Sequence, residues 1–263
     1  MSDSSEGEVP KPLEVPRSEP EEPSWYLKSL QDAFPGEPDI VSFFAGVRSG
    51  FTLQPSADQP HLLASYAVIT ADSDELAALW QAYRASQPPW LMVVATMLRR
   101  MHYLNRHKLP IAEDDLKPLL EVGRVIMATQ AAGSRMRDLE WVFLLDFWSL
   151  PWKNSSPSVM RQRLVFLLEL AAVLYRTTLP WDCLMFTMLN LIYEFENGKI
   201  QLVVPPAILA AYAKCEEEAL ASLEADLRED QRRGTEISAD FLKEFLEEYR
   251  MYPRICALAL NPG

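Results

Sequence analysis

The histidine and cysteine residues are the first candidates for metal or nucleophile chemistry. The three histidines are His61, His102 and His107, and the last two are five residues apart, which puts them on different faces of a helix. The three cysteines are widely separated and form no CxxC pattern. We therefore expect no metal site and no cofactor. Separated cysteines also favour a reducing compartment, cytoplasmic or nuclear.

A dense basic cluster is the next candidate. It comprises Arg99, Arg100, His102, Tyr103, Arg106, His107 and Lys108. Such a cluster can bind a phosphate, an acidic peptide or nucleic acid, with the tyrosine ring available for stacking. The alternative is structural, because cations in the last turns of a helix interact favourably with its terminal carbonyls. We favour the structural interpretation, since the whole chain is acidic.

Three carboxylates lie inside apolar runs and could act in acid–base catalysis. They are Asp146, Glu169 and Asp182, and a dispersed enzyme site would combine them with His102. We favour ion pairs with nearby arginines instead, because buried carboxylates are usually paired. Motifs for a serine nucleophile, a phosphate-binding loop or a dinucleotide-binding turn are absent from the sequence.

The charge of the chain is concentrated at two places. The chain has 263 residues with 37 acidic and 25 basic side chains, for a net charge of −12. Residues 1–22 hold seven acidic and two basic residues, and residues 211–250 hold twelve and six. Residues 23–210 are nearly neutral. An acidic balance opposes generic binding to nucleic acid, so we expect a nucleic-acid partner only through a local basic patch.

The elements that must position these residues are helices. With nine glycines against 20 prolines, the composition suits helices that proline punctuates. We predict ten helices, at 24–34, 39–50, 72–87, 90–105, 113–131, 134–149, 157–178, 180–197, 206–230 and 238–252. At most a short strand or extended segment is expected near 51–71 and 200–204. Pro253 is predicted to end the last helix, and the apolar segment 255–260 to pack against the body.

Two of the predicted helices begin at a Pro-Trp pair, and a third pair follows a predicted helix. Pro89-Trp90 and Pro180-Trp181 are each followed by a Thr-Met-Leu triplet at the same distance, and Pro151-Trp152 is a third pair. The pattern indicates either a recurring unit of two antiparallel helices or convergent helix punctuation. Trp90, Trp152 and Trp181 at these corners are our candidates for partner-binding anchors.

The sequence therefore predicts an all-α fold: a single multi-helix domain of stacked antiparallel helical pairs, with a solenoid-like arrangement as one form of it. Residues 1–23 are predicted to be a disordered acidic tail rich in Pro, Glu and Ser, and residues 24–263 the helical domain, with a subdivision near 133–156 as an alternative. No secretory signal and no membrane span are expected.

For function, we expect a non-enzymatic protein–protein interaction module, acting as an adaptor, scaffold or inhibitor. Helical stacks commonly present surfaces to other proteins, and the sequence carries no catalytic motif. Two alternatives remain open. One is a helical enzyme with a dispersed acid–base site, and the other is a nucleic-acid or phosphate binder that uses the cluster at 99–108. The oligomeric state is left open.

Overall fold

The computed structural model describes residues 24–49, 55–149, 155–174, 181–198 and 200–260, and within them the chain is all-α. The first six helices are α1 (Ser24–Ala33), α2 (Pro38–Ser49), α3 (Pro60–Thr70), α4 (Ser73–Ala85), α5 (Trp90–Arg106) and α6 (Glu113–Ala131). The other six are α7 (Asp138–Ser149), α8 (Pro157–Leu174), α9 (Trp181–Gly198), α10 (Pro206–Arg232), α11 (Ala239–Glu248) and α12 (Tyr252–Leu260). The predicted tail 1–23 lies outside the described residues.

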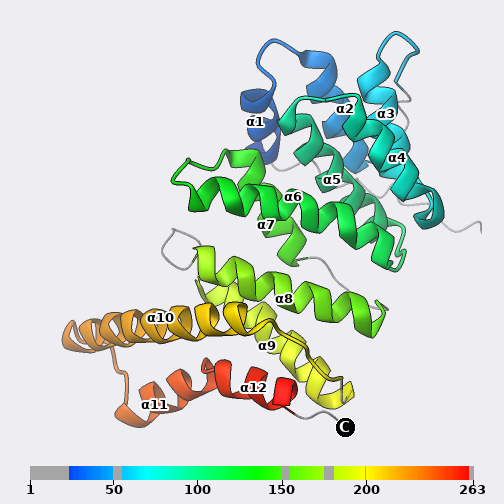
Figure 1. Cartoon of the computed structure of the whole chain (residues 1–263). Helices are drawn as coiled ribbons and strands as arrows, with labels where there is room; N and C mark the ends of the chain where they lie inside the picture. The colour runs from blue at the N-terminus through cyan, green and yellow to red at the C-terminus, as the bar shows by residue number, and fades with distance from the viewer. Residues whose placement is uncertain (1–23, 50–54, 150–154, 175–180, 199, 261–263) are drawn as a thin grey trace, which may run out of the picture.

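Most helices pack on the helix two positions along the chain. One layer runs through α4, α6, α8 and α10, and a second runs through α3, α5, α7 and α9, with α12 packed beside α9. Figure 1 shows the result as a stack that progresses from α1 at one end to α11 and α12 at the other. Stacked helical pairs, as predicted, produce this alternation, and one continuous apolar core extends from α1 to α12.

Helix α5 is the centre of the N-terminal half. It packs against α2, α3, α6 and α7, and every residue from Leu91 to Met101 is buried. A helix that is apolar on all sides is expected to be surrounded by other elements. Because Arg99 and Arg100 continue this buried run, the local sequence places two cations inside the core.

Helix α3 differs from the prediction of a strand or irregular segment at 51–71. Val68, Ile69 and Thr70 are β-branched and favour extended structure, but Leu62, Ser65 and Val68 have helical spacing and are buried. Packing against α5 thus overrides local propensity. Residues 200–204, where at most a short strand or extended segment was expected, form neither helix nor strand, and the Leu202 amide donates to the Leu258 carbonyl at 3.2 Å.

The C-terminal boundary also differs from the prediction. Helix α11 ends at Glu248, and Pro253 lies in the first turn of α12 instead of ending the preceding helix. Proline is tolerated there because the amides of a first turn have no partner within the helix. The apolar segment 255–260 does pack as expected, since Ile255 is fully buried and Leu258 packs against the core.

Candidate functional site

The basic cluster at 99–108 does not form one surface. Arg99 and Arg100 are fully buried, whereas Arg106, His107 and Lys108 are exposed at the end of α5. Only Arg106 lies in the last turn of the helix, where a cation is favoured by the helix dipole. The cluster is therefore divided between two buried cations and three at the surface.

Arg100 holds the C-terminal end of α3. Its Nη1 donates to three carbonyls at 3.0 Å, those of Val68, Ile69 and Ala71. These carbonyls belong to the end of α3, where no further turn supplies amides. Its Nε donates to Asp115 at 3.1 Å, and its Nη2 makes a close ion pair with the same carboxylate, which is itself fully buried.

Asp115 is satisfied from two further directions. The Ser73 hydroxyl donates to its Oδ2 at 3.0 Å, and the Ala112 amide donates to the same oxygen at 2.9 Å. The carboxylate thereby joins the start of α4, the start of α6 and the middle of α5. A buried charge pair with this many hydrogen bonds is a structural unit of the core.

His102 and Asp146 meet, as the enzyme alternative required, but both histidine nitrogens are engaged. Arg99 Nη1 donates to His102 Nδ1 at 2.8 Å, and the Arg99 guanidinium lies 4.1 Å from the centroid of the Tyr26 ring. Since a guanidinium only donates, Nδ1 must accept, and the imidazole proton lies on Nε2, which contacts Asp146. The Nδ1 lone pair therefore already accepts a hydrogen bond from Arg99. A general base needs this lone pair free to accept a proton from its substrate.

Of the other predicted site residues, Glu169 and Trp90 are described, and each has a partner of its own. Glu169 on α8 pairs with Arg124 on α6 at 3.2 Å, and the side chain of Asp182 lies outside the described residues. Of the predicted tryptophan anchors, Trp90 is partly buried and donates from Nε1 to Glu140 at 2.7 Å. Trp152 lies outside the described residues, as does the side chain of Trp181.

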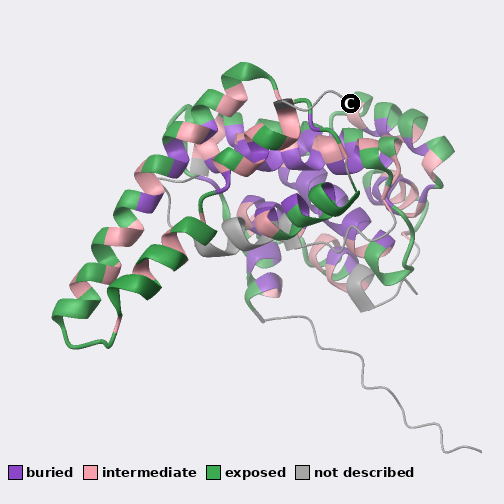
Figure 2. Cartoon of the chain, turned by 90° about the horizontal axis from the view of Figure 1, so that it is seen from below, coloured by how far each residue is buried: buried purple, intermediate pink, exposed green. Residues whose placement is uncertain are grey.

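Residues 221–250 form an exposed helical hairpin, which we call the arm. No residue of the arm is buried, although most of it is helical, in the second half of α10 and in α11. Figure 2 shows the two helices projecting from the body, and Figure 1 shows α11 beside α10 at the end of the stack. Ser238 caps α11 as predicted, accepting from the Phe241 amide at 3.0 Å.

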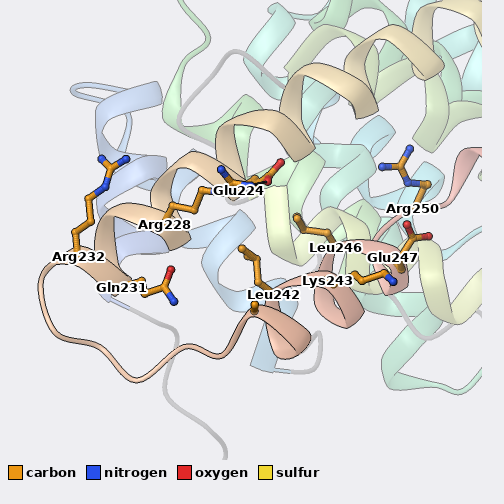
Figure 3. Close-up of a pocket in the computed structure, with 10 residues that line it drawn as sticks. Glu224, Arg228, Gln231, Arg232, Leu242, Lys243, Leu246, Glu247 and Arg250 are labelled. Atoms are coloured by element: carbon orange, nitrogen blue, oxygen red, sulfur yellow. Dashed lines mark hydrogen bonds and ion pairs between the residues drawn. The ribbon is translucent and has the colours of Figure 1, made fainter.

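One side of the arm is a groove between α10 and α11. It is lined by Glu224, Arg228, Gln231, Arg232, Ala239, Leu242, Lys243, Leu246, Glu247 and Arg250, around a volume of about 510 Å³. Leu242 and Leu246 point from α11 toward α10, and charged side chains surround them (Figure 3). A second cavity of about 540 Å³ shares Glu224, Leu246 and Arg250 with the first and extends the groove to Tyr252.

A row of aromatic rings runs along α11. Phe241, Phe245 and Tyr249 are four residues apart, and successive ring centroids are 5.7 and 4.5 Å apart. Tyr249 packs against the hydrophobic core, whereas Phe241 is 51% exposed. None of the three lines the groove. The aromatic row therefore extends the apolar core outward along the arm and into solvent.

Glu216 attaches the arm to the body. Its Oε1 accepts from the amides of Met251 and Tyr252 at 2.7 and 2.9 Å, and from the Tyr212 hydroxyl at 3.0 Å. These amides lie where α12 begins, so one buried carboxylate fixes the α11–α12 junction on α10. Burial raises the pKa of the Glu216 carboxyl above its ordinary value, and the hydrogen bonds that it accepts only partly offset this.

Replacing this carboxyl by an amide is expected to remove a pH dependence. Because the folded-state pKa of Glu216 lies above 4.5, the folded chain binds its proton more tightly. The stability that Glu216 contributes is therefore full below pH 4.5 and is lost as the pH rises through the raised pKa. Glu216→Gln stays neutral, so its free energy of unfolding should rise relative to wild type over that window, as measured by urea unfolding. Glu217→Gln, at the adjacent exposed position, should show no such trend, and a relative fall for Glu216→Gln would contradict the assignment.

Comparison with protein-family models, with curated proteins and with solved structures finds no match for the chain. No helix in the described ranges is long and apolar enough to cross a membrane. Within those ranges, no group of three or more His, Cys, Asp or Glu residues is placed to hold a metal ion. The surfaces of the chain itself are therefore the basis for inferring its function.

The sequence predicted α11 and its apolar stripe but not that the stripe would be exposed. A signal was present in the preceding helix, since residues 221–232 of α10 contain six charged side chains and only two leucines. A helix segment with so little apolar surface gains little from being covered by the body. The amphipathic helix that follows it packs on α10.

Proposed function

We propose that the protein is a non-enzymatic protein-binding module, acting as an adaptor, scaffold or inhibitor, and that the arm is its docking element. The observation that carries the proposal is α11 itself, an amphipathic helix with an aromatic row and no buried residue. Isolated helices of about ten residues are marginal in water, so most helices depend on packing of their apolar face. A partner that covers the aromatic row would supply that packing.

The size of the available apolar surface supports this role. A phenylalanine buries about 150–250 Å² when fully covered, and Phe241 retains half of its exposure. At about 25 cal/mol per Å², covering that ring alone contributes about 2 kcal/mol. Aromatic side chains also account for many binding hot spots in protein interfaces.

Two other features fit the proposal. Neither Cys215 nor Cys256 is in a disulfide, which agrees with a cytoplasmic or nuclear location. The competing phosphate-binding function would have to depend on Arg106, His107 and Lys108, because Arg99 and Arg100 are enclosed in the core. That leaves a short basic surface on an acidic protein.

A cross-linked pull-down from the native source tests the proposal. The double substitution Phe241→Gln, Phe245→Gln keeps helix propensity and removes two rings of the row. We expect recovery of the specific partners to fall at least tenfold, because loss of a hot-spot ring costs about 2 kcal/mol or more. Val203→Gln is the control, since Val203 is 80% exposed and lies outside the arm.

Circular dichroism should show that the double variant keeps the helical content of the full chain. Undiminished recovery of partners by the double variant would contradict the proposal. Loss of partners on deletion of residues 1–23, with the arm intact, would instead assign the function to the tail.

A further inference from the structure

The acidic residues of α11 are arranged along one edge of the aromatic row. Asp240, Glu244 and Glu248 each precede a ring of the row by one position, so the two rows run side by side along the helix. All three carboxylates are exposed, and none has an ion-pair partner among the residues that the structure describes. We call these three residues the acidic row.

The positions of these carboxylates are unfavourable for the helix on its own. Asp240 in the first turn is favoured by the helix dipole, but Glu247 and Glu248 lie at the other end, where the last turn has no basic residue. Carboxylates near a helix C-terminus are destabilising, and Glu244 and Glu248 repel each other at i, i+4 spacing. A cationic surface placed against the acidic row would remove both penalties.

Elsewhere in the arm, two of the acids are paired. Glu224 pairs with Arg228, and Glu229 pairs with Arg232 and Arg233, all within α10 or at its end. Asp226, Asp230 and Glu236 also have no ion-pair partner in the described part of the chain. On α11, however, three such carboxylates are aligned beside a row of aromatic rings. Residues 1–22 of the same chain do not match the acidic row in charge, because they hold seven acidic and two basic residues.

We infer that the partner of the arm is an amphipathic basic helix of another protein, whose apolar stripe packs on Phe241, Phe245 and Tyr249 and whose Lys/Arg row faces Asp240, Glu244 and Glu248. This inference rests on the proposed function and specifies its partner. Residues at i, i+4 on the incoming helix have the same spacing as both rows of α11, so rings and charges match together. A second copy of the chain would bring the same acidic row, and nucleic acid or an anionic membrane would be repelled.

Three synthetic 18-residue peptides test the inference on the full chain. The first carries a leucine stripe with lysines on both flanks, the second replaces every lysine by glutamate, and the third has the first composition in scrambled order. Titration calorimetry gives the affinities, and NMR amide shifts locate the binding. We expect the lysine peptide to shift amides of α11 and to bind at least tenfold more tightly than the other two. This difference in affinity should become smaller at high salt.

Substitutions distinguish the contribution of the acidic row to peptide affinity from the effect of the net charge of the protein. Neutralising it with Asp240→Asn, Glu244→Gln and Glu248→Gln should weaken the lysine peptide about tenfold, as the loss of three exposed ion pairs implies. The control Asp32→Asn, Glu37→Gln and Glu75→Gln changes the net charge equally at exposed positions outside the arm and should leave the affinity unchanged.

Equal affinities for the lysine and glutamate peptides, or an unchanged affinity after neutralisation of the acidic row, would overturn the inference. Its failure is distinguishable from failure of the proposed function. If Phe241→Gln, Phe245→Gln abolishes capture of native partners while neutralisation has no effect, the arm is a docking element for a partner of other chemistry. If the aromatic variant captures partners normally, the proposed function itself fails.

Discussion

Replacing Asp115 by alanine is expected to lower the free energy of unfolding by about 3–5 kcal/mol, because the Arg100 guanidinium would remain buried without its counter-charge. For a chain of this size, that loss corresponds to a fall of roughly 10 °C in the melting temperature. Thermal and urea unfolding both measure it. Asp114→Ala is a matched control, since Asp114 is the preceding residue and its ion pair with Lys117 is exposed. That control should cost at most about 1 kcal/mol.

Replacing both partners by apolar residues provides a sharper test. An ordinary buried ion pair can be exchanged for packed apolar side chains with little loss of stability. Here Arg100 also donates to three carbonyls at the end of α3, and an apolar side chain would leave them without a donor. We therefore expect Arg100→Met, Asp115→Leu to remain destabilised by at least 2 kcal/mol. Full recovery of stability in the double variant would show that Arg100 does not hold the end of α3.

The local sequence predicted most helices because their start and stop signals are local. Pro157 and Pro206 begin helices as predicted, and Ser238 makes the predicted cap of α11. Helix α3 was missed because its β-branched residues favour a strand, and only burial against α5 determines the outcome. That contact is a property of the tertiary structure and has no short-range signature.

The candidate site was predictable only in part, for the same reason. The contact between Arg100 and Asp115 spans 15 residues, and the carbonyls that Arg100 holds are about 30 residues away. A basic cluster in a sequence does not reveal which of its members are enclosed by distant helices. Likewise, the stripe of α11 is visible in the sequence, but an apolar stripe looks the same whether the body covers it or leaves it exposed. The three-dimensional arrangement distinguishes these cases.

The packing of α6 on α8 joins the two halves of the stack, and it depends on one glycine. A Cβ atom at Gly123 would lie 2.9 Å from Cε2 of Phe166 and closer still to its Cζ. Phe166 is fully buried and also packs against Phe147, with ring centroids 4.8 Å apart. The ring therefore has little room to move. We expect Gly123→Val to cost about 1–3 kcal/mol through overpacking, and Phe166→Ala to cost about 3–5 kcal/mol through the cavity that it leaves.

The two substitutions should partly compensate each other. In Gly123→Val, Phe166→Ala the valine methyl groups enter space that the ring has left, so the double variant should be about 2 kcal/mol more stable than the sum of the single losses predicts. Urea unfolding of the four chains of this double-mutant cycle measures the coupling. Valine has a higher helix propensity than glycine, so a loss of stability in Gly123→Val cannot come from helix propensity. Strict additivity of the two losses would mean that α6 and α8 do not meet through this contact.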